Sequence, residues 1–276
     1  MQSNVFICGT VRNCEPHLDN VFKNIQKIVE QFADFRIIMS YDKSDDKSLL
    51  KLTKQKAEYK TKMDIIINSD ELYNVRTMNI AKARNSCLHK IHEHIINGFS
   101  AEYFIMIDMD DVCGGYMDID VFKRAMDKSD QWDSVSFYRH GYYDIWALSI
   151  DKYIYSCWGW YNPMNAVEAM RAYVIDKLIN TPSDKLVECR SAFNGFAVYK
   201  TDKFINCVYD WRIPLKYMSL EDLFENQRLL GYPYSISPLD IQTNEPDCEH
   251  RSFHMMATHK NGARIRISPE RMFWND

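Results

Sequence analysis

The stretch Tyr-Phe-Ile-Met-Ile-Asp-Met-Asp-Asp-Val, residues 103–112, decides the fold that we expect for this chain. It begins as an apolar run of the kind that fills a buried strand, and the run stops abruptly at Asp108. Asp110 and Asp111 follow, and then a turn at Gly114-Gly115. Buried carboxylates are costly unless positive charge meets them, and divalent cations prefer oxygen ligands. The stretch therefore predicts a buried strand whose end holds a cation; the alternative is an acidic turn that only caps the strand.

The segments before this stretch alternate between strand-like and helix-like patterns, which is typical of a doubly wound α/β fold. We expect strands over 5–8, 35–39, 63–67 and 102–107, and helices over 17–32, 48–59 and 80–96. Later apolar pieces at 134–138 and 193–199, with helix-like stretches at 165–180 and 220–230, form an elaborated C-terminal half. We predict one domain over residues 1–276. It comprises a nucleotide-binding half, 1–115, and a half that shapes the second substrate's site, 116–276.

Composition excludes several classes of protein. Apolar residues make up 46% of the 276 residues and charged residues 26%, as in ordinary soluble proteins. A net charge of −4 provides no basic field for nucleic acid or anionic membranes. No apolar run is long enough to span a bilayer, and the first residues lack the pattern of a signal peptide. The eight cysteines include no CxxC pair, so we expect a soluble protein with free thiols in a reducing, cytoplasm-like compartment.

Polar residues follow the predicted strands at the edge where such sheets bind ligands. Thr10 and Arg12 follow the first strand and Asp42 the second, where each could contact a nucleotide or simply form a turn. Arg76 and Arg84 lie close to two helical turns apart, so one helix could present both guanidinium groups to a diphosphate. The alternative for this pair is a solvated basic face.

Aromatic and acidic side chains gather in the second half. Tyr143, Asp144 and Trp146 suit the binding of a sugar or peptide acceptor, although core packing explains these rings equally well. Trp158 begins a second aromatic cluster, which we expect in a substrate-facing loop because Gly159 and Asn162-Pro163 discourage regular structure. His250 and His254 share a helical face, as in a zinc-binding pair, but no third ligand follows from the sequence.

These motifs, taken in order, resemble the nucleotide-sugar glycosyltransferases of the GT-A fold. The Asp-x-Asp stretch Asp108-Met109-Asp110 at a strand end is similar to the acidic motif of that fold, and Arg76…Arg84-Asn85 to the stretch before it. Segments 141–148, 191–200 and 248–254 resemble the fungal capsule-associated mannosyltransferase family and its viral relatives.

The resemblance implies a GT-A-like (Rossmann-like), mostly parallel sheet flanked by helices and an enzyme that transfers a hexose. The donor would be a nucleoside-diphosphate sugar, with UDP favoured, and the acceptor a hydroxyl of a glycan or another molecule. Mn²⁺ or Mg²⁺ would be the cofactor, in the host cytoplasm if the protein is viral; assembly as a homo-oligomer is left open.

The resemblance also implies roles for individual residues. Asp108, Asp110 and one of His250 and His254 would coordinate the metal; Arg84, Asn85, Asp108 and Met109 would contact the donor. The base that activates the acceptor would be Glu249, which could reach the acceptor hydroxyl, or a carboxylate of the pair Glu221-Asp222. The alternative for that pair is the capped first turn of a helix.

Two other functions compete with this interpretation. Asp108-Met-Asp110-Asp111-Val112 fits the nucleophile motif of haloacid-dehalogenase-like magnesium phosphatases, in which Asp108 would be the nucleophile and Asp110 the acid/base. That motif normally follows the first strand, whereas here several β-α elements precede it. The second alternative is a sugar-nucleotide binder without a catalytic base.

Overall fold

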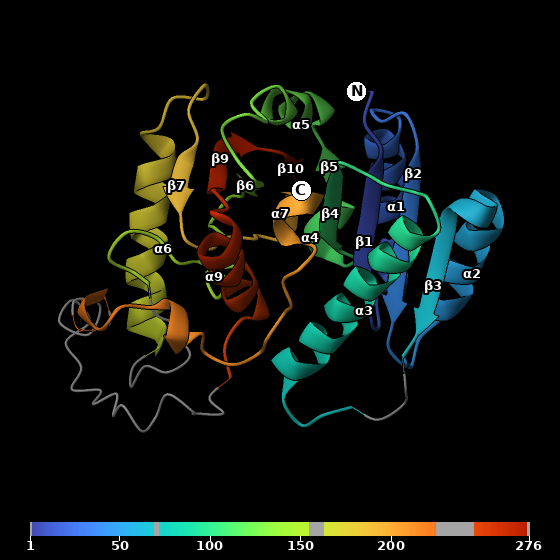
Figure 1. Cartoon of the computed structure of the whole chain (residues 1–276), viewed down its shortest axis with the longest axis horizontal. Coiled ribbons are helices and arrows are strands. Elements are labelled where there is room, and N and C mark those ends of the chain that lie inside the picture. The colour runs from blue at the N-terminus through green and yellow to red at the C-terminus, as the bar shows by residue number, and fades with distance from the viewer. Residues whose placement is uncertain (1, 69–71, 155–162, 223, 225–245, 275–276) are drawn as a thin grey trace.

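A sheet of eight strands forms the centre of the chain, in the order β3-β2-β1-β4-β8-β6-β9-β7 (Figure 1). The computed structural model describes residues 2–68, 72–154, 163–222, 224 and 246–274. The strands are β1 (Val5–Val11), β2 (Phe35–Tyr41), β3 (Met63–Ile67), β4 (Tyr103–Asp108), β6 (Ser134–Tyr138), β7 (Val187–Cys189), β8 (Phe196–Lys200) and β9 (Ile265–Arg271). Two short strands, β5 (Tyr116–Met117) and β10 (Phe273–Trp274), pair separately.

Strands β3, β2, β1 and β4 run parallel, so their carboxyl ends meet at one edge. The register pairs Thr10 with Asp108 on one side and with Ser40 on the other. The predicted α/β class with a mostly parallel central sheet is confirmed. The later half adds β8, which runs antiparallel between β4 and β6.

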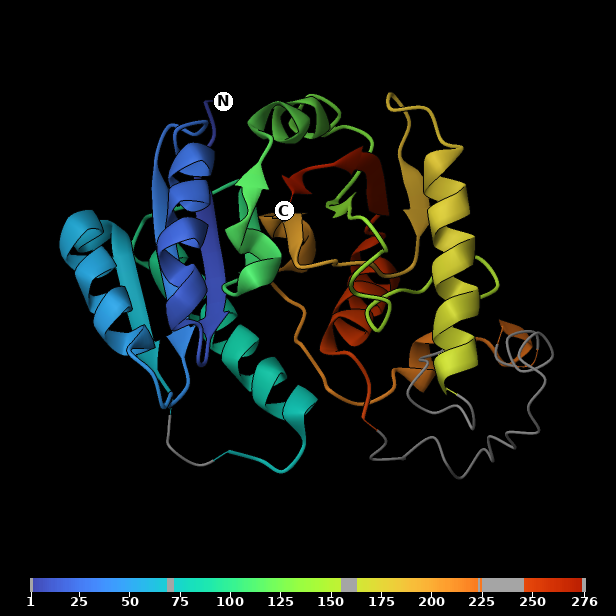
Figure 2. The same cartoon turned by 180° about the vertical axis from the view of Figure 1, so that it is seen from behind.

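Helices cover both faces of the sheet because successive strand residues are apolar on both faces. In β1, Phe6 and Cys8 belong to one buried cluster, whereas Val5 and Ile7 belong to the other. The first cluster includes side chains of α3 (Arg76–Ile96), α6 (Pro163–Ile179), α7 (Thr201–Phe204) and α9 (Glu249–Asn261). The second includes those of α1 (Glu15–Val29), α2 (Ser48–Tyr59), α4 (Asp111–Gly114) and α5 (Ile119–Met126); α1 and α2 lie in front in Figure 2.

A tight turn before β8 supports the acidic end of β4. The carbonyl oxygen of Gly195 accepts a hydrogen bond of 2.8 Å from the backbone nitrogen of Asp108. Gly195 has φ +88°, and a Cβ atom added there would lie 2.3 Å from Cγ1 of Val112. Only glycine fits this turn without strain. The turn that precedes β8 therefore holds the backbone of Asp108 at the end of β4.

Several elements begin or end where the sequence did not indicate: β1 extends to Val11, β2 extends to Tyr41, and α1 covers Glu15–Val29 rather than 17–32. Helix α3 starts at Arg76 rather than at residue 80, because the side chain of Asn79 bonds to the backbone of Tyr73 and Val75 and holds the entry turn. Of the helix expected over 220–230, residues 220–222 and 224 are helical and the rest lie outside the described residues.

The described residues include no helix long and apolar enough to cross a bilayer. Seven cysteines fall within the same part of the chain, and all are free and buried.

Candidate active site

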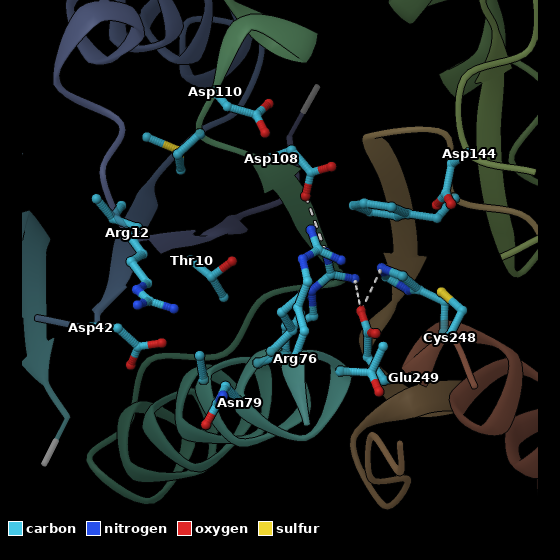
Figure 3. A pocket seen from close by; sticks show the side chains of 18 of the residues that line it. Thr10, Arg12, Asp42, Arg76, Asn79, Asp108, Asp110, Asp144, Cys248 and Glu249 are labelled. Carbon is cyan, nitrogen blue, oxygen red and sulfur yellow. Dashed lines mark hydrogen bonds and ion pairs between the residues drawn. The ribbon is translucent and has the colours of Figure 1, made fainter. Parts of the chain in front are cut away.

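A cavity of about 560 Å³ opens at the carboxyl ends of β1, β2 and β4. Figure 3 shows Thr10, Arg12 and Asp42 on one side of it, with Asp144 and Glu249 on the other. Predicted site residues make up most of the lining: Thr10, Arg12, Asp42, Arg76, Arg84, Asp108, Met109, Asp110, Tyr143, Asp144, Trp146, Glu249 and His250. The structure thus brings together residues from both halves of the chain.

The β1 and β2 side carries polar groups with room to bind a ligand. Asp42 is held in place by its backbone nitrogen, which donates to the carbonyl of Val11 at 2.9 Å. Its Oδ1 atom accepts a 2.8 Å bond from the amide of Asn68. Arg12 is exposed at the mouth of the cavity, where a guanidinium group can meet an anion.

The acidic end of β4 is short of positive charge. Burial raises the pKa of Asp108 from 3.8 to about 8, although the nearby charge of Arg84 opposes the rise. Burial also raises the pKa of Asp110, against a backbone hydrogen bond from Val112. Asp110 caps α4 by accepting that 3.1 Å bond at Oδ1. The alternative of an acidic turn that only caps therefore accounts for one of the two carboxylate oxygens of Asp110.

Arg84 is a buried cation clamped between two carboxylates. Its Nη2 atom lies 3.1 Å from Oδ1 of Asp108, and its Nη1 atom lies 2.8 Å from Oε1 of Glu249 (Figure 3). The guanidinium also stacks over the ring of Phe193, 4.6 Å from its centroid. Burial lowers the pKa of Arg84, but the charges of Glu249 and Asp108 outweigh this effect and raise it overall. Arg84 is therefore a permanent positive charge in the wall of the cavity.

The two histidines of α9 differ in their surroundings. His250 lines the cavity and stacks on Phe193 with ring centroids 3.7 Å apart. Its Nε2 atom is buried without a hydrogen-bond partner in the described part of the chain. His254 instead bonds to the hydroxyls of Ser191 and Tyr199, at 2.9 and 3.1 Å, and does not line the cavity. Burial and the charge of Arg84 keep both imidazoles neutral by lowering their pKa values, that of His254 to about 3.

The residues at the end of β4 fit a divalent cation. Burial raises the pKa of Asp108 and Asp110 although Arg84 lies beside Asp108, so the charge of Arg84 only partly compensates these carboxylates, and a bound cation would supply further positive charge. Oδ2 of Asp108 has no hydrogen-bond partner among the described residues. Within those residues no group of three or more metal-binding side chains gathers, so the structure does not bring His250 or His254 to the two aspartates. Magnesium bound through one or two carboxylates and substrate phosphates needs no third protein ligand.

The far wall of the cavity contains the predicted acceptor residues. Tyr143 is exposed, and Asp144 and Trp146 are half-buried beside it. The backbone carbonyl of Trp146 accepts a 2.6 Å bond from Arg251, a fully buried residue of α9. This hydrogen bond therefore holds the loop that contains Tyr143, Asp144 and Trp146 against α9. Trp158 lies outside the described residues.

Besides His254, three predicted residues do not line the cavity. Asn85 makes two bonds to the backbone of Tyr209, at 2.8 and 2.9 Å, and so holds a distant segment. Asp222 pairs with Arg190 through contacts of 2.7 and 3.1 Å at the surface, and Glu221 is exposed. Sequence reasoning missed several lining residues: Val11, Cys14, Thr77, Asn79, Ile80, Ala83, Phe193 and Cys248. Thr77, Asn79, Ile80 and Ala83 had a signal, since each falls within about one helical turn of Arg76 or Arg84.

No protein-family model matches the chain, and no curated protein matches it in sequence. Among solved structures it is similar to TarS 1–349 of S. aureus in complex with UDP, at 13% identity and a TM-score of 0.43, covering 99% of this chain and 59% of that one. It is also similar to the mannosyltransferase PcManGT of Pyrobaculum calidifontis in complex with GDP-Man and Mn²⁺ (11%, 0.44, 97% and 57%). A third is glucosyl-3-phosphoglycerate synthase of Mycobacterium tuberculosis with Mg²⁺ and UDP (8%, 0.40, 73% and 58%).

The chain spans less than two thirds of the length of each of these structures. Likenesses at this level carry no argument about function. The resemblance to the fungal capsule-associated family stays a prediction.

Proposed function

We propose that this chain is a metal-dependent glycosyltransferase that moves a hexose from a nucleoside-diphosphate sugar, with UDP favoured, to a hydroxyl acceptor. One observation carries the proposal. The acidic end of β4 opens into the same cavity as Arg12 and Asp42 at the carboxyl ends of β1 and β2, and the aromatic loop with Asp144 forms the opposite wall. A nucleotide, a diphosphate and an acceptor each find suitable chemistry there.

The donor would lie across the strand ends. Thr10 and Asp42 offer hydrogen bonds to the base or ribose, and Arg12 and Arg76 offer guanidinium groups to the phosphates. Met109 is buried and lines the cavity. A Cβ atom added to Gly9 would lie 2.7 Å from the Met109 side chain, so Met109 packs closely against β1.

Asp108 and Asp110 would hold the Mn²⁺ or Mg²⁺ ion. When bound, the ion neutralises charge that develops on the leaving diphosphate. Arg84 keeps Asp108 in place through its 3.1 Å contact. Arg84 would provide a second positive charge beside the reacting groups. This charge does not depend on pH, because an arginine guanidinium stays protonated in proteins.

The alternatives are less well supported. In a phosphatase of the haloacid-dehalogenase type, the nucleophile motif normally follows the first strand, whereas β4 follows three earlier strands of the sheet. A binder without catalysis would need no carboxylate on the acceptor side, where both Asp144 and Glu249 line the cavity.

Nucleotide release from a panel of UDP- and GDP-sugars tests the proposal. The full chain with Mn²⁺ should release nucleotide from at least one sugar, and EDTA should abolish the release. Release from no member of the panel, with either metal, contradicts transfer. Metal-dependent hydrolysis of p-nitrophenyl phosphate instead would favour the phosphatase.

A further inference from the structure

Asp144 is a carboxylate that the fold holds rigidly but leaves with one oxygen unengaged. Its backbone nitrogen donates a 2.9 Å bond to Oδ1 of the buried Asn194. Its own Oδ1 atom accepts from the backbone nitrogen of Ala147 at 3.2 Å. Oδ2 makes no hydrogen bond to any residue that the structure describes. An oxygen so placed on the cavity wall can accept a bond from a ligand.

The same turn positions Asp144 and the proposed metal-binding strand end. Asn194 binds the loop of Asp144, and the next residue, Gly195, binds the backbone nitrogen of Asp108. The amide of Asn194 is itself fixed by a 2.9 Å bond to the carbonyl of Phe137. Asp144 and Asp108 are therefore held relative to each other by two adjacent residues, as a pair of groups acting on one reaction would need to be.

The other candidate carboxylates are worse placed to reach an acceptor. Glu249 is only 3% exposed and engages the guanidinium of Arg84 through Oε1. Asp222 lies at the surface in an ion pair with Arg190, outside the cavity. Asp144 combines access with an unengaged oxygen, and a general base must come within hydrogen-bond reach of the proton it removes.

We propose that Asp144 is the general base of the transfer and that Glu249 is a positioning residue that holds Arg84. This inference rests on the proposed function. Oδ2 of Asp144 takes the proton of the acceptor hydroxyl while the oxygen of that hydroxyl forms a bond to the anomeric carbon of the donor sugar. The bond from that carbon to the diphosphate oxygen breaks, and its electron pair leaves with the diphosphate. The proton then passes from Asp144 to solvent. A single displacement of this kind inverts the anomeric configuration.

The electrostatic surroundings suit this role. Burial and the charge of Glu249 raise the pKa of Asp144 from 3.8 to about 6, whereas Arg84, the bond from Ala147 and Arg251 oppose the rise. The other titratable groups that interact with Asp144 are Asp108, Tyr142, Tyr143 and Cys248. A base whose pKa lies near the working pH is the most effective, because it is ionised yet still basic.

The test uses the full chain, with the nucleotide sugar from which it releases most nucleotide and with water as the acceptor. D144N should lower kcat for release by about 10²–10⁴-fold. Its affinity for UDP with Mn²⁺ should equal that of the wild type. The wild-type rate should rise with pH through about 6, and D144N should lack the rise. E249Q should keep a rise because the base remains, but at lower pH, since the charge of Glu249 no longer raises the pKa of Asp144. D184N removes a carboxylate at the exposed Asp184 and should leave the rate unchanged.

Two results would overturn the inference alone: a D144N rate equal to that of D184N, or weaker binding of the donor by D144N at unchanged kcat. A sugar product that retains the donor's anomeric configuration, detected by proton NMR, would also exclude the single displacement. A wild-type chain that binds no nucleotide overturns the proposed function instead.

Discussion

Replacing Arg84 by methionine should destabilise the protein severely, because it leaves two buried carboxylates without a partner. The side chains of Arg84 and Glu249 are 6% and 4% exposed, and that of Asp108 is 17% exposed. Removing one partner of a buried ion pair costs about 3–5 kcal/mol, most of which is the penalty of the orphaned charge. This is a large share of the roughly 5–15 kcal/mol that stabilises a typical protein.

Urea unfolding followed by tryptophan fluorescence, in buffer with EDTA, measures the loss. R190M is the matched control, because Arg190 and Asp222 form a similar pair whose side chains are 43% and 25% exposed. Surface pairs contribute about 0–1 kcal/mol, so R190M should change little. If R84M does not fold, R84K provides the comparison: it keeps the charge but not the two-pronged guanidinium, and it should lose less than R84M.

The double variant R84M/E249M distinguishes two causes of the lost stability: the unpaired charge of Glu249 and the lost packing of the Arg84 side chain. Replacing both partners by apolar groups of similar size is often close to neutral, so the double variant should recover part of the stability that R84M loses. If the free energy of unfolding of R84M is within about 1 kcal/mol of the wild-type value, this account of the contacts between Arg84, Asp108 and Glu249 is wrong.

Two further predictions concern stability. G195A should cost on the order of 2–5 kcal/mol, from backbone strain at φ +88° and overlap with Val112. G262A, where φ is +62° with nothing within 4 Å of the added Cβ, should cost only about 1–2 kcal/mol; equal losses would contradict the overlap. Bonds from Arg264 overcome burial and lower the pKa of Asp133 from 3.8 to about 2. Because the folded pKa is lowered, this stabilisation is present above about pH 4 and disappears as the pH falls towards 2. D133N should therefore be about 2 kcal/mol less stable than the wild type at pH 7, with the difference shrinking in acid; a constant difference would be contrary evidence.

Local patterns were enough to predict the first half of the fold. The helix over 48–59 and the strand over 63–67 coincide with α2 and β3, because their apolar spacing and flanking turns are local signals. Strand β1 extends to Val11, beyond the expected end at residue 8, because pairing with β2 on one side and β4 on the other prolongs it past its apolar core. Such pairing depends on distant residues and leaves no mark in a short window of sequence.

The site shows the same division between local and distant causes. The Asp-x-Asp stretch was visible because carboxylates interrupt an apolar strand. Arg84 and Asn85 were assigned together, but neighbouring helical residues point in different directions, and Asn85 binds a backbone 124 residues away. His250 and His254 share a helical face, yet only His250 reaches the cavity, since Ser191 and Tyr199 surround His254. These distinctions arise from tertiary contacts alone.

Calorimetric titration of UDP into the full chain, with and without Mn²⁺, tests the central claim most directly. We expect UDP to bind in the presence of Mn²⁺ and its affinity to fall at least about tenfold when EDTA removes the metal, a difference of about 1.4 kcal/mol. D110N should bind UDP equally weakly in both conditions, because it lacks a carboxylate that would hold the ion. If neither UDP nor GDP binds the wild-type chain with Mn²⁺, the cavity at the end of β4 is not a nucleotide-sugar site.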